Sequence, residues 1–591
     1  MQKVTRTFDI LDRLKNEFPE KAMLTGKNGK NWYSYTTTEY INKVNYLSAS
    51  LLKIGINKQD KVVTICNNRP EWNILDMALA QVGAVHVPLY PNLSSEEYQF
   101  LLSHSDCRMV IFGNQPLYNR AKEAIPNTTQ EIEFIYSIDP IEGIDNLQIL
   151  IDRGQEIYPS LKNRIEEIKE SISEDDMFTI IYTSGTTGTS KGVMVPHRAM
   201  VTNAIESSTC QPLNHNHKTI SFLPLNHVYE RMLNYHMQYK GLEICYARNI
   251  GTVTTDLQEL HADIFSTVPR FLEKVYDAVM SKRKNLTGAK AKIFDWAIKV
   301  GEEFEYDKLN NPIYKLKLNI ARKLVFSKWA AALGGNIKVV ISGGAALQPR
   351  LARIFSAVGI SVQEGYGLSE TGPVIAVNKF EIENRMIGTV GPVLDGVSCK
   401  IAEDGEILCK GPNLMLGYYK DPQYTDEVVD KDGWFHTGDI GVLVDNKFLK
   451  ITDRKKSIFK LSSGKYIAPQ VIENRLKESP YIEQLMIVGE QEKFVAAVVS
   501  PNLDQLADWA KNNHIQFEEK EALVLHPDVI KMINKEISSF NKRMSPHEHI
   551  KKSFITADQW SSETNELSAT LKLKRDIIAE KYKIVIAKMF G

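Results

Sequence analysis

The sequence has no long apolar run and no net charge, and no secretion signal is expected. No stretch of about 18 or more apolar residues occurs in the 591 residues, so no membrane-spanning helix is expected. Residues 1–14 carry scattered charges and lack the apolar core of a signal peptide. Lysine plus arginine equals aspartate plus glutamate, at 72 each, so charge gives no reason to expect a nucleic acid as partner.

Clusters of metal-binding or redox-active residues are also missing from the sequence. The six cysteines are far apart, and none has the spacing of a zinc or redox motif. They are expected to be thiols in a reducing cytoplasm. His215 and His217 flank an asparagine and have no third ligand in sight, which indicates a solvated loop rather than a metal site.

The remaining pattern is that of a large folded α/β protein. Hydrophobic residues make up 43% and charged residues 24%, which implies no large disordered fraction. Alternating apolar and amphipathic segments predict strands at Lys61–Cys66, Arg108–Phe112, Phe178–Tyr182 and Ile337–Ile341, and helices at Thr37–Ile54 and Ser95–Ser103. This alternation predicts largely parallel sheets, with ligands at the loops beyond the carboxyl ends of the strands.

The pattern changes near residue 396. Shorter strands, such as Cys399–Ala402 and Ile407–Lys410, alternate with Gly and Asp turns and predict a β-rich subdomain over about 396–453. A smaller α+β region follows, with predicted strands at Gln484–Val488 and Phe494–Ser500. We therefore expect two domains, residues 1–453 and residues 454–591, which agrees with the length of the chain.

The strongest motif directly follows the predicted strand at Phe178–Tyr182. Glycines permit close backbone approach, hydroxyl groups and amides donate hydrogen bonds, and Lys191 adds a positive charge, so the loop suits a polyphosphate. It is not a Walker P-loop, because no Ser or Thr follows Lys191. A flexible linker is the alternative, but its abrupt start after a strand argues against it. The candidate nucleotide-binding residues here are Thr183, Ser184, Gly185, Thr186, Thr187, Gly188, Thr189 and Lys191.

A second glycine-rich motif spans residues 363–372, Gln-Glu-Gly-Tyr-Gly-Leu-Ser-Glu-Thr-Gly. A tyrosine ring between two glycines can stack on a purine while the bare backbone approaches the nucleotide. The carboxylate of Glu370 is a hard oxygen ligand that suits a Mg²⁺ ion bridging phosphates. Gly343 and Gly344 follow the strand predicted at Ile337–Ile341; alone they mark a strand-to-helix turn, where small residues would let the backbone lie against an adenine ring.

In this order, the motifs resemble those of the adenylate-forming superfamily of acyl-CoA synthetases, peptide-synthetase adenylation domains and luciferases. The resemblance extends along nearly the whole chain. The segments 68–72 (Asn-Arg-Pro-Glu-Trp), 87–91 (Val-Pro-Leu-Tyr-Pro) and 223–231 (Leu-Pro-Leu-Asn-His-Val-Tyr-Glu-Arg) resemble long-chain fatty acyl-CoA synthetases in particular. The resemblance implies a large N-terminal domain of layered sheets that binds AMP and the acyl group, with a small mobile C-terminal domain.

The resemblance also implies roles for residues of the N-terminal domain. Tyr366, between Gly365 and Gly367, would line the adenine pocket, Ser369 would contact the α-phosphate, and Glu370 would hold Mg²⁺. Many relatives have Thr where Ser369 stands, and both residues keep a hydroxyl group. His227 would border the acyl pocket and the thiol passage, although a lone His is often only a core residue.

Residues toward the C-terminus complete this expected site. Asp439 and Arg454 are the expected ribose ligands, and Lys456 would be the hinge on which the C-terminal domain rotates. The loop around Gly464 resembles the one that forms the coenzyme A tunnel, where a residue without Cβ suits a narrow channel. Lys572 matches the terminal catalytic lysine when the motif is aligned on its arginine, although Ala569 replaces a common Pro.

The implied reaction is the activation of a medium- or long-chain fatty acid. ATP and the acid would give acyl-AMP and pyrophosphate, and coenzyme A would then take the acyl group. Lys572, Glu370, Lys191 and His227 are the expected catalytic residues. Stabilisation would come from positioned charges, and no protein nucleophile is needed.

Three alternatives stay open at this point. A fatty acyl-AMP ligase that loads a carrier protein shares the nucleotide motifs, a short-chain or aryl-acid synthetase has the same core, and a non-catalytic nucleotide-binding scaffold would need none of these charged residues. Location is expected to be cytoplasmic, with peripheral membrane contact as a further possibility. For Leu571–Phe590, which mixes lysines with apolar residues, a packed helix is favoured over such a contact.

Overall fold

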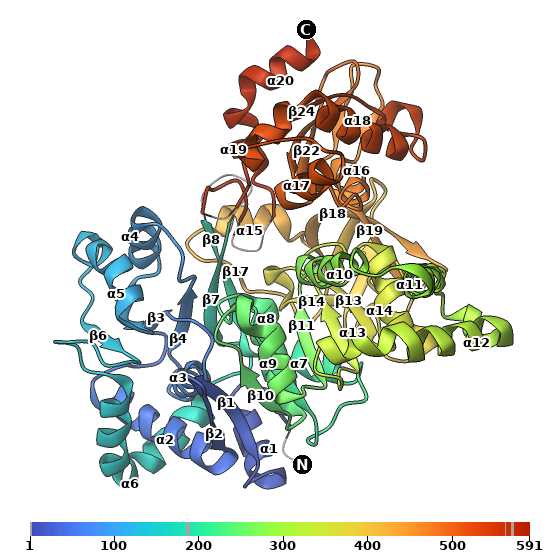
Figure 1. Ribbon diagram of the computed structural model, residues 1–591. Helices are drawn as coiled ribbons and strands as arrows, with labels where there is room; N and C mark the ends of the chain where they lie inside the picture. The colour runs from blue at the N-terminus through green and yellow to red at the C-terminus, as the bar shows by residue number, and fades with distance from the viewer. Residues whose placement is uncertain (1–2, 185–189, 562, 569–571) are drawn as a thin grey trace.

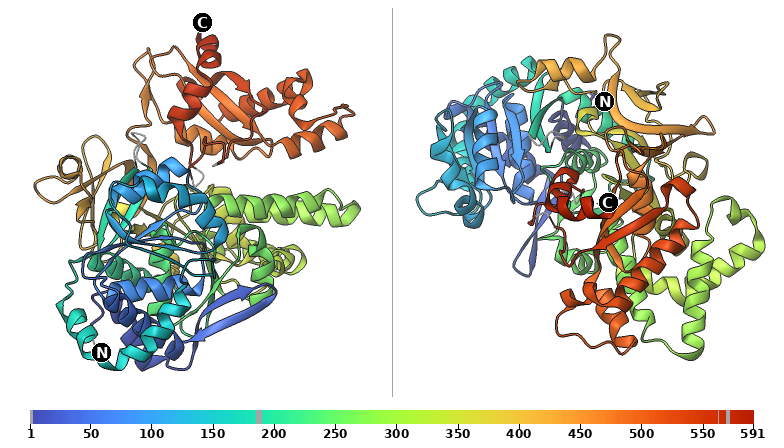
Figure 2. Two further views of the ribbon diagram at one scale, coloured as in Figure 1. Left: turned by 90° about the vertical axis from the view of Figure 1, so that its left-hand side faces the viewer. Right: turned by 90° about the horizontal axis from the view of Figure 1, so that it is seen from above.

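The computed structural model describes residues 3–184, 190–561, 563–568 and 572–591. A large N-terminal part is built from two sheets with helices around and between them, and a smaller C-terminal part stands above it (Figure 1). Two further views show the same arrangement, with the last strands and helices over one end of the larger part (Figure 2). The predicted α/β class is confirmed.

The first sheet is mostly parallel. Across the sheet its strands are β14 (Val374–Val377), β13 (Ser361–Gly367), β12 (Val339–Ser342), β11 (Ile264–Thr267), β9 (Lys218–Ser221), β10 (Glu243–Tyr246), β1 (Ala22–Asn28) and β2 (Asn31–Thr36). The strands from β13 to β1 run parallel, while β14 and β2 pair antiparallel at the edges. The carboxyl ends of β11, β12 and β13 therefore meet at one edge, where ligands gather in such sheets.

The second sheet carries the hairpin of the Thr/Gly-rich motif. Its strands, in order, are β17 (Gly417–Tyr418), β8 (Ser190–Pro196), β7 (Met177–Ser184), β4 (Val85–Leu89), β3 (Lys61–Ile65), β5 (Cys107–Phe112) and β6 (Phe134–Ser137). Strand β8 pairs antiparallel with β7 and brings Lys191 opposite Thr183. The lysine of the motif is therefore fixed by strand pairing.

Helices cover and separate the two sheets. They are α1 (Asp9–Glu17), α2 (Thr37–Lys53), α3 (Pro70–Gln81), α4 (Ser95–His104), α5 (Gln115–Ala121), α6 (Leu147–Ser171), α7 (His197–Ser208), α8 (Val228–Tyr239), α9 (Val253–Leu260), α10 (Pro269–Arg283), α11 (Gly288–Glu302), α12 (Pro312–Ala321), α13 (Ser327–Ala332) and α14 (Pro349–Val358). Local sequence sets several starts: Thr36 with Glu39, and Ser94 with Glu97, form capping boxes.

A buried polar network anchors α8 between the sheets. Asp76 of α3 forms an ion pair with Arg231 of α8 and accepts a hydrogen bond from His86 Nδ1 of β4 at 2.6 Å. Arg231 Nη1 also donates to Thr179 Oγ1 of β7, at 2.6 Å. Burial alone would raise the pKa of Asp76, but Arg231 and His86 outweigh it and lower the pKa to about 2. The start of α8, which follows His227, is thereby held against α3 and the second sheet.

The rest of the chain forms smaller sheets. One has the order β15 (Ser398–Ile401), β16 (Glu406–Lys410), β18 (Phe435–Val444) and β19 (Phe448–Arg454), with α15 (Pro422–Val428) inserted. Beyond it lie β20 (Phe459–Lys460), β21 (Tyr466–Ile467), α16 (Pro469–Leu476), β22 (Ile482–Val488), β23 (Val495–Pro501), α17 (Leu503–Asn512), α18 (Pro527–Asn541), β24 (Ile550–Ile555), α19 (Arg575–Lys581) and α20 (Lys583–Phe590).

Most of the predicted elements are confirmed to within two residues. The expected helix at Thr37–Ile54 is α2, and the expected strands at Gln484–Val488 and Phe494–Ser500 are β22 and β23. No helix among the described residues is long and apolar enough to cross a membrane. In the stretch ending at Phe590, Ile578 and Met589 are buried in a cluster with Met486 and Val498, as expected for packed helices.

Candidate active site

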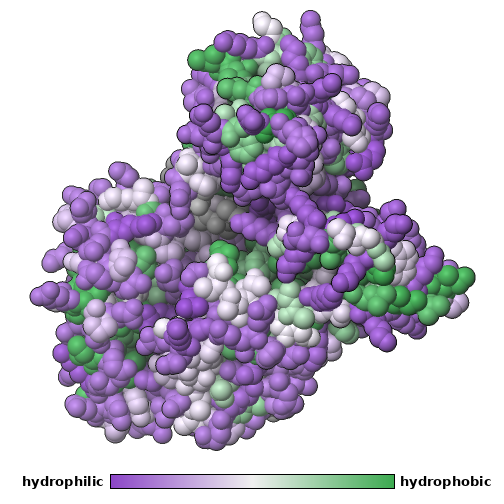
Figure 3. All heavy atoms as spheres, viewed as in Figure 1, coloured by the Kyte–Doolittle hydropathy of each residue, from purple (hydrophilic) through white to green (hydrophobic). Residues whose placement is uncertain are grey.

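A cavity of about 670 Å³ lies where the N-terminal and C-terminal parts meet. The surface is hollowed between the two parts in the space-filling view (Figure 3). Its lining comes from the carboxyl ends of β12 and β13, strands β7 and β8, the start of α8, and, in the C-terminal part, Asn565, Leu567, Ser568, Lys572 and Lys574. Segments far apart in the sequence thus supply one site.

Residues that follow parallel strands form one wall of the cavity. Gly343 and Gly344 follow β12, and Gly365, Tyr366 and Gly367 end β13. The space beside Gly343 is taken by the ring of Tyr229, which would lie 3.0 Å from an added Cβ. A side chain at position 343 would therefore displace Tyr229 from the pocket wall.

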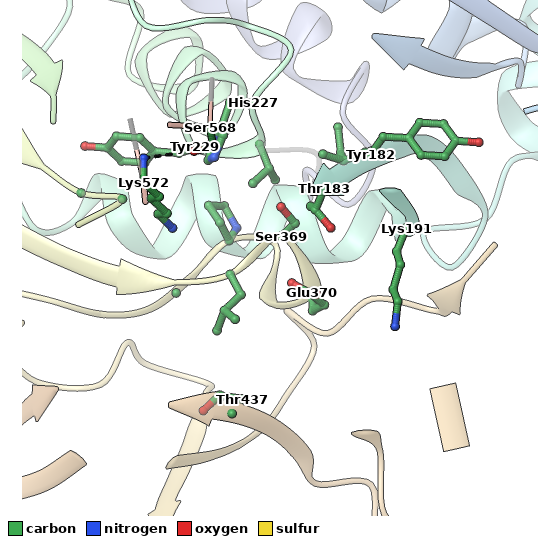
Figure 4. A pocket seen from close by; sticks show the side chains of 18 of the residues that line it. Tyr182, Thr183, Lys191, His227, Tyr229, Ser369, Glu370, Thr437, Ser568 and Lys572 are labelled. Atoms are coloured by element: carbon green, nitrogen blue, oxygen red, sulfur yellow. Dashed lines mark hydrogen bonds between the residues drawn. The ribbon is translucent and has the colours of Figure 1, made fainter. Parts of the chain in front are cut away.

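Charged groups of opposite sign face each other around Ser369. Figure 4 shows Lys572 and His227 on one side, Lys191 and Thr183 on the other, and Ser369 with Glu370 between them. Ser369 and Glu370 begin a short 3₁₀ helix directly after β13. An anion in this space would lie between two lysines, and a cation could bind Glu370.

Glu370 and Lys191 are each oriented by a tyrosine. Tyr418 donates a hydrogen bond to Glu370 Oε1 at 2.7 Å. Lys191 Nζ lies 2.7 Å from the ring centroid of Tyr424, a cation–π contact. The sequence patterns did not single out Tyr418 or Tyr424, because nothing local links them to residues of distant motifs.

The candidate ribose ligands form a connected group. Tyr366 donates to Asp439 Oδ2 at 2.8 Å, and Arg454 Nε lies 3.0 Å from Asp439 Oδ1. Asp439 and Arg454 are partners in the antiparallel pairing of β18 and β19. Both Asp439 oxygens thus already have donors within the protein, and Asp439 itself is not among the residues that line the cavity, whereas Tyr366 and Arg454 are.

Lys572 enters the cavity from the C-terminal part. Its backbone N–H donates to Ser568 Oγ at 3.1 Å, and its side chain is exposed to the cavity. Surrounding protein removes much of the hydration of the Lys572 ammonium, which disfavours its charged form. The positive charge of Arg454 disfavours that form further. Together they lower the pKa of Lys572 to about 8, against the opposing charges of Asp439 and Glu370. Such a group can change its protonation near neutral pH.

His227 lines the same cavity at the start of α8. Its Nδ1 accepts a hydrogen bond from the backbone of Tyr229 at 3.2 Å, which makes it the N-cap of the helix. Burial, with a smaller effect from Lys572, lowers the pKa of His227 to about 4. The imidazole is therefore neutral at pH 7, and its capping role is structural as well.

The structure brings most of the expected site residues together. Thr183, Lys191, Ser369, Glu370, Arg454, Lys456 and Lys572 all line the cavity, as do His227 and the glycine-rich wall. Gly464 does not lie among the described lining residues. It is exposed in the turn between β20 and β21, with a φ of +85°. Gly185, Thr186, Thr187, Gly188 and Thr189 lie outside the described residues, and of Ser184 only the backbone, at the end of β7, is described.

The residues around Glu370 fit a magnesium ion that is shared with a nucleotide. Mg²⁺ usually binds through one or two carboxylates together with substrate phosphates and water. The Glu370 carboxylate, in the same cavity as Lys191 and Lys572, suits that mode. Within residues 3–184, 190–561, 563–568 and 572–591, no cluster of three or more His, Cys, Asp or Glu could form an all-protein metal cage.

This combination of a layered α/β fold and a cavity closed by a lysine from a second domain defines a class of nucleotide-dependent enzymes. The chain belongs to the AMP-binding enzyme family. The family model matches residues 11–419, and the model of the family's C-terminal domain matches residues 456–591.

Individual relatives and a solved structure are similar to this chain over nearly its whole length. Long-chain-fatty-acid–CoA ligase FadD15 of Mycobacterium bovis is 31% identical, over 95% of this chain and 93% of the relative. Long-chain-fatty-acid–CoA ligase 5 of Mus musculus is 32% identical, over 95% and 84%. The adenylation domain of a carboxylate reductase from Mycobacterium chelonae shares the fold, with a TM-score of 0.74, 19% identity and coverage of 100% and 92%.

Proposed function

We propose that the protein is an AMP-forming long-chain fatty acid–CoA ligase. The observation that carries this proposal is that Lys572 of the C-terminal part enters the cavity that holds Lys191, Glu370 and the glycine-rich strand ends. Relatives named as long-chain-fatty-acid–CoA ligases span nearly the whole chain, which supports the same activity. The substrates are a fatty acid, ATP and coenzyme A, and no nucleic acid is a partner.

In the first step, the fatty carboxylate attacks the α-phosphorus of ATP and pyrophosphate leaves. Negative charge grows on the transferring phosphoryl group and on the leaving group, so preorganised cations stabilise the transition state. Lys191, held over Tyr424, faces the leaving phosphates. Lys572 orients the carboxylate and the α-phosphate, while Asp439 and Arg454 hold the ribose, which fixes the attack geometry.

Magnesium belongs to this site together with the nucleotide. Glu370 would hold the ion, and Tyr418 orients the carboxylate that does so. Bound there, Mg²⁺ would neutralise phosphate charge. This role also explains why Glu370 lies next to Ser369, the candidate α-phosphate contact, at the end of β13.

In the second step, the coenzyme A thiol attacks the acyl-adenylate carbonyl and AMP leaves. Lys572 occupies the cavity in the orientation described, so the C-terminal part must move to admit the thiol. We assign residues 1–453 to nucleotide and acyl binding, and residues 454–591 to a lid that rotates about Lys456. The rotation would bring Gly464 to the coenzyme A channel, a hinge motion of a common kind.

The test of this function is pyrophosphate release with ATP and Mg²⁺ across a series of fatty acids, with and without coenzyme A. Acyl-CoA is followed by mass. Accumulation of acyl-CoA is the expected result. Pyrophosphate and acyl-adenylate without any thioester would point to a ligase that loads a carrier protein, and no turnover with any acid would favour a non-catalytic scaffold.

An exposed apolar stripe on α12 and on the π-helical turn that follows it, Arg322–Phe326, supports peripheral contact with an anionic membrane. Ile313, Leu316, Ile320 and Leu324 follow one another at helical spacing, and each is between 42% and 66% exposed. A hydrophobic patch appears over this end of the molecule in Figure 3. Residues 312–328 include four exposed lysines and no acidic residue, and such a helix binds apolar and anionic lipid together.

Vesicle sedimentation tests the membrane contact. Binding to vesicles that contain phosphatidylglycerol, and weaker binding to pure phosphatidylcholine, is expected for the natural protein. Leu316→Ser with Leu324→Ser should weaken that binding several-fold. Ile250→Ser, at an isolated exposed position elsewhere, is the matched control. Equal binding by both variants would reject the α12 stripe as the membrane contact. The cytoplasmic location of the protein stays a prediction.

A further inference from the structure

The cavity has an apolar limb that leads away from the charged groups. Its walls are Val228, Met232 and Leu233 near the start of α8, Ile341 of β12, and Val374 and Val377 of β14. An acyl chain whose carboxylate lies near Ser369 would extend into this limb. Yet two polar residues, Ser207 and Gln211, also line the cavity, and they are only 4% and 3% exposed.

The two polar residues lie at the inner part of the limb. Asn203 of α7 accepts a hydrogen bond from Val374 N at 2.5 Å and donates to Thr371 O at 3.3 Å, which places the middle of α7 beside the Ser369–Thr371 segment. Ser207 is one helical turn further, about 5 Å along the axis. Gln211 follows after the helix ends. Both residues are therefore reached after the charged groups, along the direction of α7.

A chain of hydrogen bonds determines which side-chain atom of Gln211 is left without a partner. The backbone oxygen of Cys210 can only accept, so Gln363 Nε2 is the donor to it, at 3.1 Å. Gln363 Oε1 must then accept from Gln211 Nε2, at 2.9 Å. Gln211 Oε1 remains, a buried acceptor that has no hydrogen-bond partner among the described residues. Burying such an acceptor without a partner costs free energy.

Ser207 is oriented by a buried histidine. Its Oγ lies 2.9 Å from His236 Nδ1, and it also approaches Met232 Sδ at 3.7 Å. Burial, helped by Lys240, lowers the pKa of His236 to about 3, so the imidazole is neutral. Its Nε2 has no partner among the described residues either. Lys240 Nζ donates to the backbone oxygens of Ser208 and Gln211, and Lys240 is not among the residues that line the cavity.

The chemistry of this pair selects one kind of ligand group. A neutral buried acceptor and a serine hydroxyl that line the same cavity suit a group that can both donate and accept a hydrogen bond. A hydroxyl group does so. A ketone or ether cannot donate to Gln211 Oε1, and a carboxylate would bring an unpaired charge into an apolar limb.

We propose that Gln211 and Ser207 form a binding site for a hydroxyl group on the acyl chain, so that hydroxylated fatty acids are preferred substrates. The hydroxyl donates to Gln211 Oε1 and accepts from Ser207 Oγ. This assignment requires the His236 tautomer with its proton on Nδ1, so that His236 donates to Ser207 Oγ and leaves the serine proton for the ligand. This inference rests on the proposed ligase function and adds the substrate class. An apolar chain would leave Gln211 Oε1 unpaired, whereas the hydroxylated chain satisfies it, and this difference is the source of discrimination.

The test compares fatty acids of one chain length that carry a hydroxyl at successive positions with the unsubstituted acid. The readout is kcat/KM for acyl-CoA formation. At one position, or two adjacent ones, the hydroxy acid should exceed the unsubstituted acid roughly tenfold or more. If unsubstituted acids react and no hydroxyl position is favoured, the site binds water only and this inference fails alone. If no acid of either kind reacts, the ligase function fails with it.

Substitutions attribute the preference to the cluster. Gln211→Met keeps a similar volume and removes the acceptor, so the ratio of hydroxy to unsubstituted kcat/KM should fall to about one or below. Ser207→Ala should lower the same ratio less. Gln155→Met, exposed on α6, should leave the ratio unchanged. An unchanged ratio in folded Gln211→Met would overturn the assignment even if the natural enzyme prefers hydroxy acids.

Discussion

At the scale of single residues, Lys572 has the largest expected effect on the chemistry. Lys572→Ala removes the charge that faces both the carboxylate and the α-phosphate, so acyl-adenylate formation should fall about a hundredfold or more. Thioester formation from supplied acyl-adenylate should change far less. Single-turnover measurements of each half-reaction test this, with Lys583→Ala, exposed on α20, as the control. Equal losses in both half-reactions would contradict the assigned role.

The pH dependence of adenylation should report the same ammonium group. The pKa of Lys572 is lowered to about 8, so the side chain is protonated below that value and loses its charge above it. We expect kcat/KM for ATP in the adenylation half-reaction to decline as the pH rises through about 8. Lys572→Arg keeps its charge and should lack this decline. The same alkaline decline in the arginine variant would assign it to another group.

Glu364 is a residue whose burial should affect stability rather than chemistry. Burial raises the pKa of this carboxyl to about 8, although the backbone at Leu347 and Gly388 donates to it. Between the ordinary value near 4.5 and about 8, the folded state holds a proton that the unfolded state has lost. Stability from this group is therefore lost as the pH rises through that window.

Glu364→Gln should remove this loss. The variant should have a higher Tm than the natural protein at pH 8, by about 2 °C or more, and a similar Tm at pH 5. Thermal unfolding at the two pH values measures the difference. Glu156→Gln, an exposed carboxyl on α6, serves as control. A Tm difference that does not depend on pH would show that Glu364 is charged in the fold.

At the scale of elements, close packing of helices decides where glycine is required. Helices α2 and α6 lie against each other, and an added Cβ at Gly154 would approach the backbone oxygen of Tyr46 to 1.9 Å. In a helix interior, alanine is normally more favourable than glycine by about 1 kcal/mol. Here that preference is outweighed, because the backbone of α2 would have to move.

Gly154→Ala should therefore destabilise the protein. We expect the free energy of unfolding of the N-terminal part to fall by roughly 2 kcal/mol, in the range for overpacked cores. Denaturant unfolding followed by tryptophan fluorescence measures the change. Gln155→Ala, exposed on the same helix, should be neutral or slightly stabilising. A stabilising effect of Gly154→Ala would mean that the two helices separate easily.

At the scale of the whole molecule, the C-terminal part is held by polar contacts. Arg270 pairs with Glu483, Lys284 Nζ lies 2.6 Å from Asp508 Oδ2, and Gln348 Nε2 donates to Lys477 O at 3.4 Å. The Lys284–Asp508 pair is exposed and contributes little stability, and the Arg270–Glu483 pair is only partly buried. The orientation that brings Lys572 into the cavity can therefore be exchanged for another at low cost, as a two-step reaction needs.

Substitution at Gly464 tests whether the C-terminal part changes its orientation between the two half-reactions. Gly464→Trp should lower thioester formation by about tenfold or more, because a large side chain would fill the expected coenzyme A channel, while adenylation stays near normal. Gly464→Asn keeps a residue that tolerates a positive φ and is the matched control. Loss of adenylation in the tryptophan variant, with thioester formation intact, would place Gly464 in the first half-reaction instead.

The sequence by itself determined those features of this protein that depend on residues close together in the chain. The strand before Thr183, the glycines around Tyr366 and the helix caps at Thr36 and Ser94 depend on neighbours in the chain, so their local patterns predicted them. The same holds for the α/β class, because apolar periodicity sets which elements form.

Tertiary structure alone decided which distant residues meet. Tyr418 orients Glu370 across 48 residues, and Gln211 meets Gln363 across 152. No local pattern could supply these contacts, because they depend on how the strands order themselves and how α7 and α8 pack between the sheets. The charged half of the site was visible in its motifs, whereas the polar end of the acyl limb exists only in the folded chain.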